Sequence, residues 1–515
     1  MHSSRAIIIG SGIAGMAAAI RLAVSGHEVT VYEKNSHAGG KLSLIEQDGF
    51  RFDAGPSLFT NPRELEALFE LAGEHISNYI TYKQVESTCS YFFANGKSLT
   101  AWSDREKLLA AFTEQLEEPA ETVSAYLENS ERLYNSIGNA FLNNPLHPGW
   151  LMRNSSFYKA LGALRPYLLF DTLNEFHEKS FTTGEAIQVF NRFATYNGSN
   201  PYAAPAMLCI VPHVELNEGV FYPEGGMISI AKALYQLAVK KGVQFHFNTP
   251  VERIICAGNH IQGIVVNGEN IFSEIVVSNA DIYLTYRDLL CNERAAAKIA
   301  SREKSSSAIV FCWGMKKEFP SLQLHNVFFS GDYRAEFQHL FTGKTLYKDP
   351  TVYINITSKM ESGHAPSGNE NWFVMVNVPS GITAKDQEQL IAFARLQILK
   401  KLRGTFKEDI EPYIATEAIL DPAWLEKNTG AYEGAIYGIS SNTKKSAFLR
   451  HPNFASAIKG LFFCGGTVHP GGGIPLCLKS AKIVGEMAEA HQAGNKQSMK
   501  RGINPELTSL SRNVS

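Results

Sequence analysis

The first 33 residues show an apolar pattern whose period changes twice. The run Ala6–Ile9 is continuously apolar, which is typical of a short buried strand. From Ile13 to Ile20 the apolar side chains recur at helical spacing, and Ser25-Gly26-His27 is a helix stop signal. The segment Glu28–Glu33 then predicts a second strand. These residues therefore predict a strand–helix–strand unit with a glycine-rich turn after its first strand.

A similar order returns near the other end of the 515-residue chain. Leu461–Phe463 is strand-like, Gly465–Gly473 is rich in glycine, and Ile474–Met487 has apolar residues at helical spacing. Pro475 suits the first turn of such a helix, where its missing N–H would have no intrahelical partner. Both ends of the chain thus predict a glycine loop that opens a helix, which indicates that they close on one large anionic ligand.

The middle of the chain predicts further elements of both kinds. Ile228–Ala238 is amphipathic with a helical period, and Val243–Phe247 alternates like a strand. The apolar runs Ala308–Trp313 and Trp372–Val378 predict strands of another sheet, whereas residues 86–215 are richer in helix-like pattern. A chain of this length favours two or more domains.

The spacing of Gly10, Gly12 and Gly15 matches a dinucleotide-binding turn. In such a turn the first glycine makes the tight bend, the second lets the backbone approach a pyrophosphate, and the third lets the helix pack on the strand. The phosphates lie at the helix N-terminus, where unpaired N–H groups and the helix dipole favour negative charge. Glu33 lies 18 residues beyond Gly15, close to the position of an acid that binds ribose hydroxyls. An acid there disfavours a 2′-phosphate, so the pattern predicts a dinucleotide other than NADP.

Several further motifs carry a resemblance to a known family. They are Gly39-Gly40-Lys41, Asp53-Ala54-Gly55-Pro56-Ser57, Tyr222–Met227, Val277–Asp281 and the terminal Gly465–Pro475. With these motifs the chain resembles the FAD-dependent amine oxidase and phytoene desaturase superfamily, from residue 6 to about residue 490. The resemblance implies an α/β fold with a discontinuous, Rossmann-like FAD-binding domain, a mixed-sheet substrate domain and a helical region.

A second cofactor segment so far along the chain suits FAD better than NAD, because FAD is the longer ligand and carries an isoalloxazine ring. A helix N-terminus at Ile474 would stabilise negative charge on the reduced ring. The resemblance also implies that the backbone of Val251 contacts the adenine end. No metal ligand and no catalytic side chain is predicted. The predicted cofactor-binding residues are Gly10, Gly12, Ile13, Ala14, Gly15, Glu33, Lys34, Gly39, Gly40, Lys41, Gly55, Pro56, Ser57, Leu58, Val251, Asn279, Gly465, Gly466, Gly473, Ile474 and Pro475.

We expect the FAD-binding domain to be built from three separate segments, with the other parts of the chain inserted between them. The end of the chain is polar and irregular, which is typical of disorder. The predicted ranges are 1–85, 216–289 and 425–493 for the FAD-binding domain, 86–215 for the helical substrate region, 290–424 for the substrate-domain sheet and 494–515 for a disordered tail.

The stretch 140–170 combines aromatic and leucine side chains with interspersed basic residues. Two interpretations stay open. Residues such as Trp150, Leu151 and Phe157 suit a helix that lies in a bilayer interface and forms a membrane-facing entrance, and they also suit a core helix with solvated charges. No uninterrupted apolar run reaches transmembrane length. Glycines and Arg21 interrupt the apolar start, so no signal peptide is predicted. The expected location is cytoplasmic, with peripheral association at the membrane surface.

Composition narrows the function classes. A formal net charge of −2 provides no electrostatic argument for nucleic acid. Seven scattered cysteines without a C-x-x-C pair favour a reducing compartment and argue against a zinc site or a disulfide framework. No Ser-His-Asp, Cys-His or H-E-x-x-H arrangement is evident, which suits a flavin oxidation because the cofactor accepts the hydride. His469 is expected to hold its loop by a hydrogen bond.

The residues around the terminal glycines also bear on the substrate. Val468 and Gly472 replace the threonine and alanine usual in phytoene desaturases, and Val468–Cys477 resembles 1-hydroxycarotenoid 3,4-desaturases more closely. The resemblance implies a carotenoid that loses a hydride to the flavin and then a proton, which forms a C=C bond at an acyclic end. Oxygen or a quinone would then reoxidise the flavin. We expect the apolar chain of the substrate in a tunnel and its tertiary hydroxyl at a polar stop, since an unpaired buried polar group costs about 1–3 kcal/mol.

The same residues are also compatible with other functions. A phytoene or lycopene-forming desaturase is the first alternative, followed by a carotenoid isomerase or saturase and by a flavin amine oxidase. A GDP-dissociation inhibitor shares the implied fold without using flavin, but such proteins lack the intact terminal flavin signature that this chain keeps.

Overall fold

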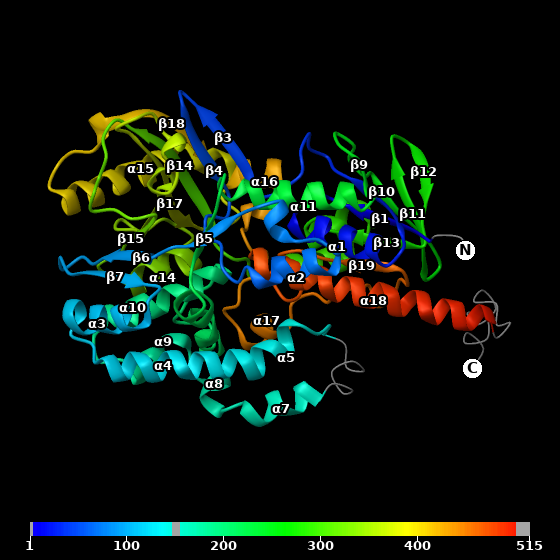
Figure 1. Ribbon diagram of the computed structural model, residues 1–515, viewed down its shortest axis with the longest axis horizontal. Coiled ribbons are helices and arrows are strands. Elements are labelled where there is room, and N and C mark those ends of the chain that lie inside the picture. Colours follow the sequence, from blue (N-terminus) through cyan, green and yellow to red (C-terminus); the bar gives the residue numbers. More distant parts are fainter. Residues whose placement is uncertain (1–3, 147–154, 501–515) are drawn as a thin grey trace.

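The computed structural model describes residues 4–146 and 155–500, and two sheets organise them (Figure 1). The first sheet has five strands in the order β19-β13-β1-β2-β9. All four pairings between neighbours are parallel. The carboxyl ends of strands from the start, middle and end of the chain therefore meet at one edge. The strands are β1 (Arg5–Ile9), β2 (Glu28–Tyr32), β9 (Gln244–His246), β13 (Ile275–Ser278) and β19 (Leu461–Phe463).

Helices α1 (Ile13–Val24), α11 (Ile228–Lys240) and α18 (Ile474–Lys500) pack together beside this sheet, with α2 (Arg63–Leu71) against them (Figure 1). The alanines of α1 explain the packing, because Ala17, Ala18 and Ala19 are fully buried and let neighbouring helices approach closely. Such a helix, apolar on nearly all sides, is typical of a core position.

The second sheet has seven strands in the order β18-β14-β17-β16-β15-β6-β7. Its pairings are antiparallel except for the parallel pair β15–β6, so the sheet is mixed. Every residue of β14, which lies between β18 and β17, is buried, and the long helix α15 (Ala384–Phe406) lies over this part of the molecule (Figure 1). The strands are β6 (Ser87–Phe92), β7 (Ser98–Trp102), β14 (Ser307–Met315), β15 (His325–Phe328), β16 (Val352–Asn355), β17 (Glu370–Val378) and β18 (Ile414–Leu420).

A group of helices packs against β6 and β7 and forms a separate aromatic core (Figure 1). Glu118 is fully buried here and accepts hydrogen bonds from the backbone and side chains of Thr182 and Thr183. Thr183 in turn caps the next helix, so one carboxylate fixes the turn between two helices. The helices are α3 (Arg105–Leu116), α4 (Ala120–Leu133), α5 (Asn139–Leu142), α7 (Ser155–Ala163), α8 (Pro166–Phe170), α9 (Leu173–Ser180) and α10 (Gly184–Asn191).

Short elements complete the described chain. The carboxylate of Asp53 accepts from the backbone N–H groups of Met227 and Ile228, which joins strand β4 to the start of α11. The remaining strands are β3 (Ser43–Gln47), β4 (Phe50–Ala54), β5 (Tyr82–Gln84), β8 (Phe221–Pro223), β10 (Arg253–Ala257), β11 (His260–Val266) and β12 (Glu269–Phe272). The remaining α-helices are α12 (Ile282–Leu284), α13 (Glu293–Ala300), α14 (Tyr333–Gln338), α16 (Pro422–Thr429) and α17 (Lys444–Phe448).

The structure differs from the predicted segments at two places. Strands β6 and β7 belong to the second sheet, so the range 86–215 is helical only after them. Helix α18 extends to Lys500, into the range predicted to be disordered, and the lysine, glutamine and methionine residues there are good helix formers. Residues 501–515, like Trp150 and Leu151, lie outside the described residues, and the side chain of Phe157 is not described. In the described part of the chain, no helix is both long enough and apolar enough to cross a bilayer.

Candidate active site

The turn from β1 to α1 is so tight that it requires glycine. Gly10 has a φ of +93°. A Cβ added to Gly15 would lie 2.2 Å from the carbonyl oxygen of Gly10, so any larger side chain would force helix and strand apart. The N-terminus of α1 therefore stays close to the edge of the sheet, with its first N–H groups at the cavity described below.

Glu33 holds this turn from the end of β2. Its Oε2 accepts from the backbone N–H of Ser11 at 2.7 Å and from the Ser11 hydroxyl at 2.8 Å. Its Oε1 accepts from the N–H of Asn35 at 2.9 Å. Although Glu33 is only 5% exposed, it lines the cavity. A carboxylate has about four acceptor positions, so this one can accept further hydrogen bonds from a ligand.

Asn279 joins the glycine loops at the two ends of the chain. Its backbone N–H donates to Ile9 at 2.8 Å, and its side-chain Nδ2 donates to the carbonyl of Cys464 at 3.0 Å. A Cβ added to Gly12 would lie 2.7 Å from its Oδ1, and one added to Gly465 would lie 2.5 Å from its Nδ2. The amide thus fills the space that the missing side chains leave between the two loops.

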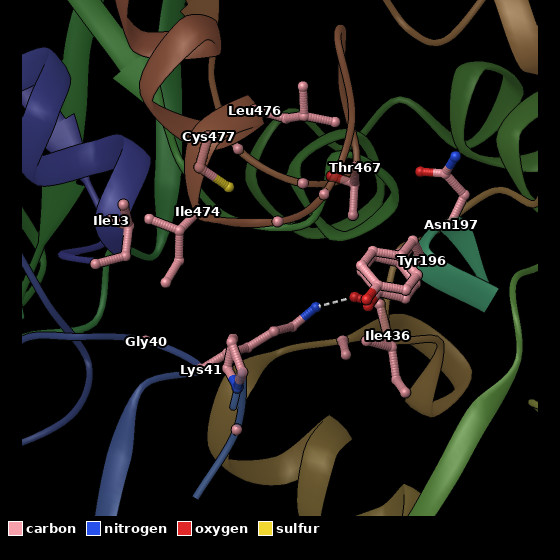
Figure 2. Close-up of a pocket in the computed structure, with 18 of the residues that line it drawn as sticks. Ile13, Gly40, Lys41, Tyr196, Asn197, Ile436, Thr467, Ile474, Leu476 and Cys477 are labelled. Atoms are coloured by element: carbon pink, nitrogen blue, oxygen red, sulfur yellow. Dashed lines mark hydrogen bonds between the residues drawn. The ribbon is translucent and has the colours of Figure 1, made fainter. Parts of the chain in front are cut away.

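The Gly39-Gly40-Lys41 segment forms the next wall. Gly39 forms a parallel bridge with Gly12, and a Cβ added to Gly40 would lie 3.1 Å from the Cα of Gly12. The Nζ of Lys41 donates to the carbonyl of Ile436, as Figure 2 shows. Burial lowers the pKa of Lys41, while the nearby carboxylate of Asp281 acts in the opposite direction.

The C-terminal loop between β19 and α18 forms another wall. The ring of Tyr437 packs on Gly472, where an added Cβ would lie 2.4 Å from a ring carbon. Arg450 donates to the carbonyls of Tyr437 at 3.0 Å and Gly466 at 3.3 Å, and burial lowers the pKa of its guanidinium to about 10. These contacts fix the backbone that precedes the N-terminus of α18.

His469 holds the same loop, as the sequence predicts. Its Nε2–H donates to the carbonyls of Phe141 at 2.9 Å and Asn144 at 3.0 Å, at the end of α5. Burial lowers the pKa of His469 to about 4, so the ring is neutral at neutral pH. The histidine therefore ties the terminal glycine loop to the helical region.

A cavity of about 800 Å³ lies between these walls. Every predicted cofactor-binding residue except Gly15 lines it, and Gly15 instead permits the tight packing of α1. The cavity continues beyond the glycine loops into an apolar part formed by the helical region and the second sheet. We call this part the apolar chamber. Its lining residues include Ile137, Phe141, Leu142, Met207, Leu208, Ile210, Val211, Val214, Val327, Phe337, Leu340 and Met375.

Short π-helical segments shape the cavity wall. The segments η2 (Tyr134–Gly138), η5 (His213–Asn217), η6 (Thr285–Leu289) and η7 (His339–Gly343) each contribute lining residues. Such one-turn π-helical segments occur often at functional sites because they disturb the regular ladder and redirect side chains. They carry no repeating apolar pattern, so the sequence analysis could not locate them.

A set of buried polar groups in and behind the wall of the cavity could not be predicted from the sequence. The hydroxyl of Ser57, one of the predicted cofactor residues, lies 2.8 Å from the hydroxyl of Tyr353, which lies 2.7 Å from Nδ1 of His325. Burial and the charge of Arg192 lower the pKa of His325 to about 3. Arg192, Tyr196 and Glu215 line the same cavity, although nothing in their sequence spacing connects them.

Comparison with known proteins places the chain in a family. Residues 13–485 match the family of flavin containing amine oxidoreductases. The chain belongs to this family. A curated relative in the family, the 1-hydroxycarotenoid 3,4-desaturase of Flavobacterium sp. (strain P99-3), is 45% identical over 94% of this chain and 98% of its own length. The 4,4′-diaponeurosporene oxygenase of Staphylococcus haemolyticus (strain JCSC1435) is 32% identical over 95% of this chain and 98% of its own length.

Solved structures of this flavin oxidoreductase fold agree with the architecture. An oxidoreductase from Methanosarcina mazei superposes with a TM-score of 0.62 at 16% identity, covering 94% of this chain and all of that one. Wild-type putrescine oxidase bound to putrescine superposes with a TM-score of 0.60 at 15% identity, covering 96% of this chain and 99% of that one. At this identity the likeness establishes the fold.

The cavity walls fit the cofactor that a flavin oxidoreductase family implies. Glycines at Gly10, Gly12 and Gly40 bring backbone to the cavity without side chains, and an acid stands at Glu33. Two helix N-termini, at Ile13 and Ile474, open at the cavity. Helix N-termini favour anionic groups, so the donor set suits a long ligand with a pyrophosphate in its middle.

Proposed function

We propose that the protein is an FAD-dependent carotenoid desaturase that introduces a C=C bond into an acyclic carotenoid end, by 3,4-desaturation of a 1-hydroxycarotenoid. The observation that carries the proposal is the 45% identity over 94% of the chain with a 1-hydroxycarotenoid 3,4-desaturase. The cavity supports it, because one continuous space joins the glycine loops to the apolar chamber.

The residues of the glycine loops would hold FAD. The backbone of Gly12 and the N-terminus of α1 suit the pyrophosphate, Glu33 suits the ribose hydroxyls of the adenosine half, and Val251 suits the adenine end. The segment Gly473–Pro475 and the N-terminus of α18 suit the isoalloxazine ring. When bound, FAD supplies the acceptor for the hydride that the substrate loses.

The rest of the cavity would bind and orient the polyene. A carotenoid chain is apolar, and burying it in the chamber gains about 25 cal/mol for each Å² removed from water. The chamber also excludes water from the reacting carbons, which strengthens the electrostatic effect of the α18 N-terminus at the ring.

We also infer peripheral association with a membrane, since a carotenoid partitions into bilayers. Phe170 at the end of α8 is 71% exposed and Leu449 at the end of α17 is 53% exposed. Lys444 lies 4.1 Å above the ring of Phe170, which joins α8 to α17. Ala447 of α17 and Arg450, two residues after the end of this helix, line the cavity, so this exposed apolar surface adjoins the cavity wall. Oxygen or a quinone as the electron acceptor stays a prediction.

A comparison of substrates tests the proposed reaction. The purified protein, loaded with FAD, is incubated separately with a 1-hydroxycarotenoid and with phytoene, and the products are analysed by absorbance and mass. We expect the hydroxylated substrate to lose two hydrogens and to absorb at longer wavelength, while phytoene is unchanged. Conversion of phytoene alone would instead support the phytoene desaturase alternative.

A further inference from the structure

A buried ion pair stands in the wall of the apolar chamber. Arg192, on the short helix η3 (Arg192–Asn197), is 9% exposed, and Glu215, on the π-helical segment η5, is 1% exposed. The Nη1 of Arg192 lies 3.6 Å from Oε1 of Glu215. Both residues line the cavity, so the pair is hidden from bulk solvent but faces the space where a substrate would lie.

Two tyrosine hydroxyls complete this group. Arg192 donates from Nη1 to the hydroxyl of Tyr91 at 3.1 Å and from Nη2 to that of Tyr196 at 3.4 Å. Tyr196 donates to Oε2 of Glu215, and Tyr91 lies 3.5 Å from its Oε1. The guanidinium also lies over the rings of Tyr91 and Tyr196, at 5.5 Å and 5.3 Å from their centroids. We call these four residues the polar cluster.

The polar cluster can still bind a ligand. A guanidinium has five N–H donors, and among the described residues its hydrogen-bond acceptors are the two tyrosine hydroxyls. The carboxylate of Glu215 likewise has about four acceptor positions. A hydroxyl group of a ligand can accept and donate hydrogen bonds at the same time. It could accept a hydrogen bond from Arg192 and donate one to Glu215 or to the hydroxyl oxygen of Tyr196.

The position of the polar cluster agrees with the chemistry of a 1-hydroxycarotenoid. Helix η3 ends at Gly198, where an added Cβ would lie 3.0 Å from the ring of Tyr437. Tyr437 follows Ile436, whose carbonyl receives Lys41 of the glycine-loop wall, and Figure 2 shows Tyr196 in this part of the cavity. The cluster thus stands where the apolar chamber meets the glycine loops. In a 1-hydroxycarotenoid the hydroxyl is two carbon–carbon bonds from C3, so it must also lie beside the reacting carbons.

A purely hydrocarbon substrate would form no hydrogen bond with the polar cluster and would gain no affinity from it. Replacing a buried ion pair by apolar residues is often neutral or favourable for stability, so stability is not a sufficient reason for charges at this place. A hydrocarbon end in contact with them would strip water from the charged groups without replacing its hydrogen bonds. The polar cluster therefore favours a substrate end that carries an oxygen.

We propose that Arg192 and Tyr196, with Glu215 holding them in place, bind the tertiary hydroxyl of the substrate and select hydroxylated over non-hydroxylated carotenoid ends. The proposal rests on the proposed function. In enzymes generally, a site that hydrogen-bonds a substrate hydroxyl can lower kcat/KM for the analogue without that hydroxyl by up to about 10⁴–10⁵-fold. A preference of at least about tenfold is expected here.

The test compares kcat/KM for a 1-hydroxycarotenoid and for the same polyene with hydrogen in place of the hydroxyl. The variant Tyr196→Phe removes one hydroxyl and keeps the ring. We expect it to reduce the preference of the wild-type protein by about fivefold, the effect of one hydrogen bond between uncharged groups. Tyr126→Phe is the matched control, because the Tyr126 hydroxyl is also buried but bonds to His177 away from the cavity, and it should leave the preference unchanged.

A second variant removes the charges together. Single removal of Arg192 or Glu215 would strand its partner as a buried, unpaired charge, so Arg192→Met is combined with Glu215→Leu, and FAD content reports folding. We expect this double variant to convert both substrates equally. A role in folding alone would change the two rates by the same factor and keep their ratio.

The outcomes separate the two proposals. Equal kcat/KM of the wild-type protein for both substrates, or an unchanged ratio in Tyr196→Phe, would overturn the hydroxyl site while leaving the desaturase function intact. Failure of the FAD-loaded protein to desaturate either substrate would overturn the proposed function, and the hydroxyl site with it.

Discussion

Asn279 follows β13 and lies between the loops after β1 and β19, because its Nδ2 donates to the carbonyl of Cys464 at 3.0 Å and its Oδ1 would lie 2.7 Å from a Cβ added to Gly12. These loops are more than 450 residues apart in the sequence. A ligand that contacts both would depend on this link, because the link sets the spacing of the two glycine segments. Asn279 thus lines the cavity and also holds together the walls of the proposed FAD site.

The variant Asn279→Ala tests this link. It leaves the Cys464 carbonyl without its donor, which costs about 1–3 kcal/mol, and it opens a gap between the loops. We expect the dissociation constant for FAD to rise about tenfold, equivalent to about 1.4 kcal/mol. FAD titration followed by flavin fluorescence measures it.

Asn355→Ala is the matched control for this experiment. Asn355 is also buried and donates to the Leu324 carbonyl at 3.1 Å, but it does not line the cavity. It should lower the melting temperature of the protein without FAD and leave FAD affinity unchanged. Equal losses of FAD affinity in both variants would argue against a specific role for Asn279.

Substitution of Gly15 tests the closed turn. The added methyl group of Gly15→Ala would lie 2.2 Å from the Gly10 carbonyl oxygen, so we expect a destabilisation of about 1–3 kcal/mol from the forced shift and a loss of bound FAD. Gly404→Ala is the control, because the added Cβ of this glycine of α15 would have no side chain or backbone within 4 Å apart from its chain neighbours and the nearby backbone of its own helix. The control should stabilise the protein by about 0.5–1 kcal/mol. Chemical denaturation measures both values, and a tolerated Gly15→Ala would contradict the geometry.

Acid should destabilise the protein through its buried histidines. Burial lowers the pKa of His469 to about 4, from an ordinary value of 6.5. At a pH between these values the unfolded chain binds a proton that the folded chain does not, so the free energy of unfolding falls as the pH falls through this window. One such histidine contributes up to about 1.4 kcal/mol per pH unit. His177 and His325, with pKa values lowered by burial to about 3, act in the same direction.

The variant His469→Gln separates one histidine from the rest. Glutamine can still donate to the Phe141 and Asn144 carbonyls but does not titrate. Between pH 6.5 and pH 4, the slope of the unfolding free energy against pH should therefore decrease by the amount that corresponds to one bound proton, about 1.4 kcal/mol per pH unit. Denaturant titrations across this range measure the slope. An unchanged slope would mean that His469 is protonated as readily in the folded protein as in the unfolded chain.

Binding to vesicles tests the exposed apolar surface at α8 and α17. Burial of one large apolar side chain contributes about 1.5–3 kcal/mol, so Phe170→Ser combined with Leu449→Ser should weaken the partition coefficient by about 100-fold. Phe272→Ser with Leu396→Ser is the control, because these side chains are each 61% exposed on other elements, β12 and α15. Co-sedimentation with anionic phospholipid vesicles measures binding, and equal effects of the two pairs would contradict membrane association through this surface.

The sequence predicted the glycine loops well because their constraints are local. Gly10, Gly12 and Gly15 are required by one turn, and Glu33 follows at a spacing that a single strand–helix–strand unit sets. The motifs far from this unit, such as Gly39-Gly40-Lys41, came from the family resemblance, and the structure places them on the same cavity. A role in binding FAD remains a proposal for each of them.

The polar cluster could not be predicted in this way. Arg192, Tyr196 and Glu215 lie on 3₁₀ and π-helical segments of five or six residues, which are too short to show a periodic pattern. Tyr91 reaches them from β6, a strand that pairs with β15 from a distant part of the chain. Only the tertiary fold brings these side chains together. The family resemblance implied a polar stop for the substrate, but no sequence pattern identified its residues.

The most direct test of the account is a single turnover without an external electron acceptor. The FAD-loaded protein is mixed anaerobically with a 1-hydroxycarotenoid, and the flavin and polyene absorbances are followed together. We expect the yellow flavin absorbance to be bleached while the polyene absorbance shifts to longer wavelength, with one flavin reduced for each polyene converted. A protein that takes up no FAD, or a flavin that stays oxidised while this substrate is bound, would contradict it.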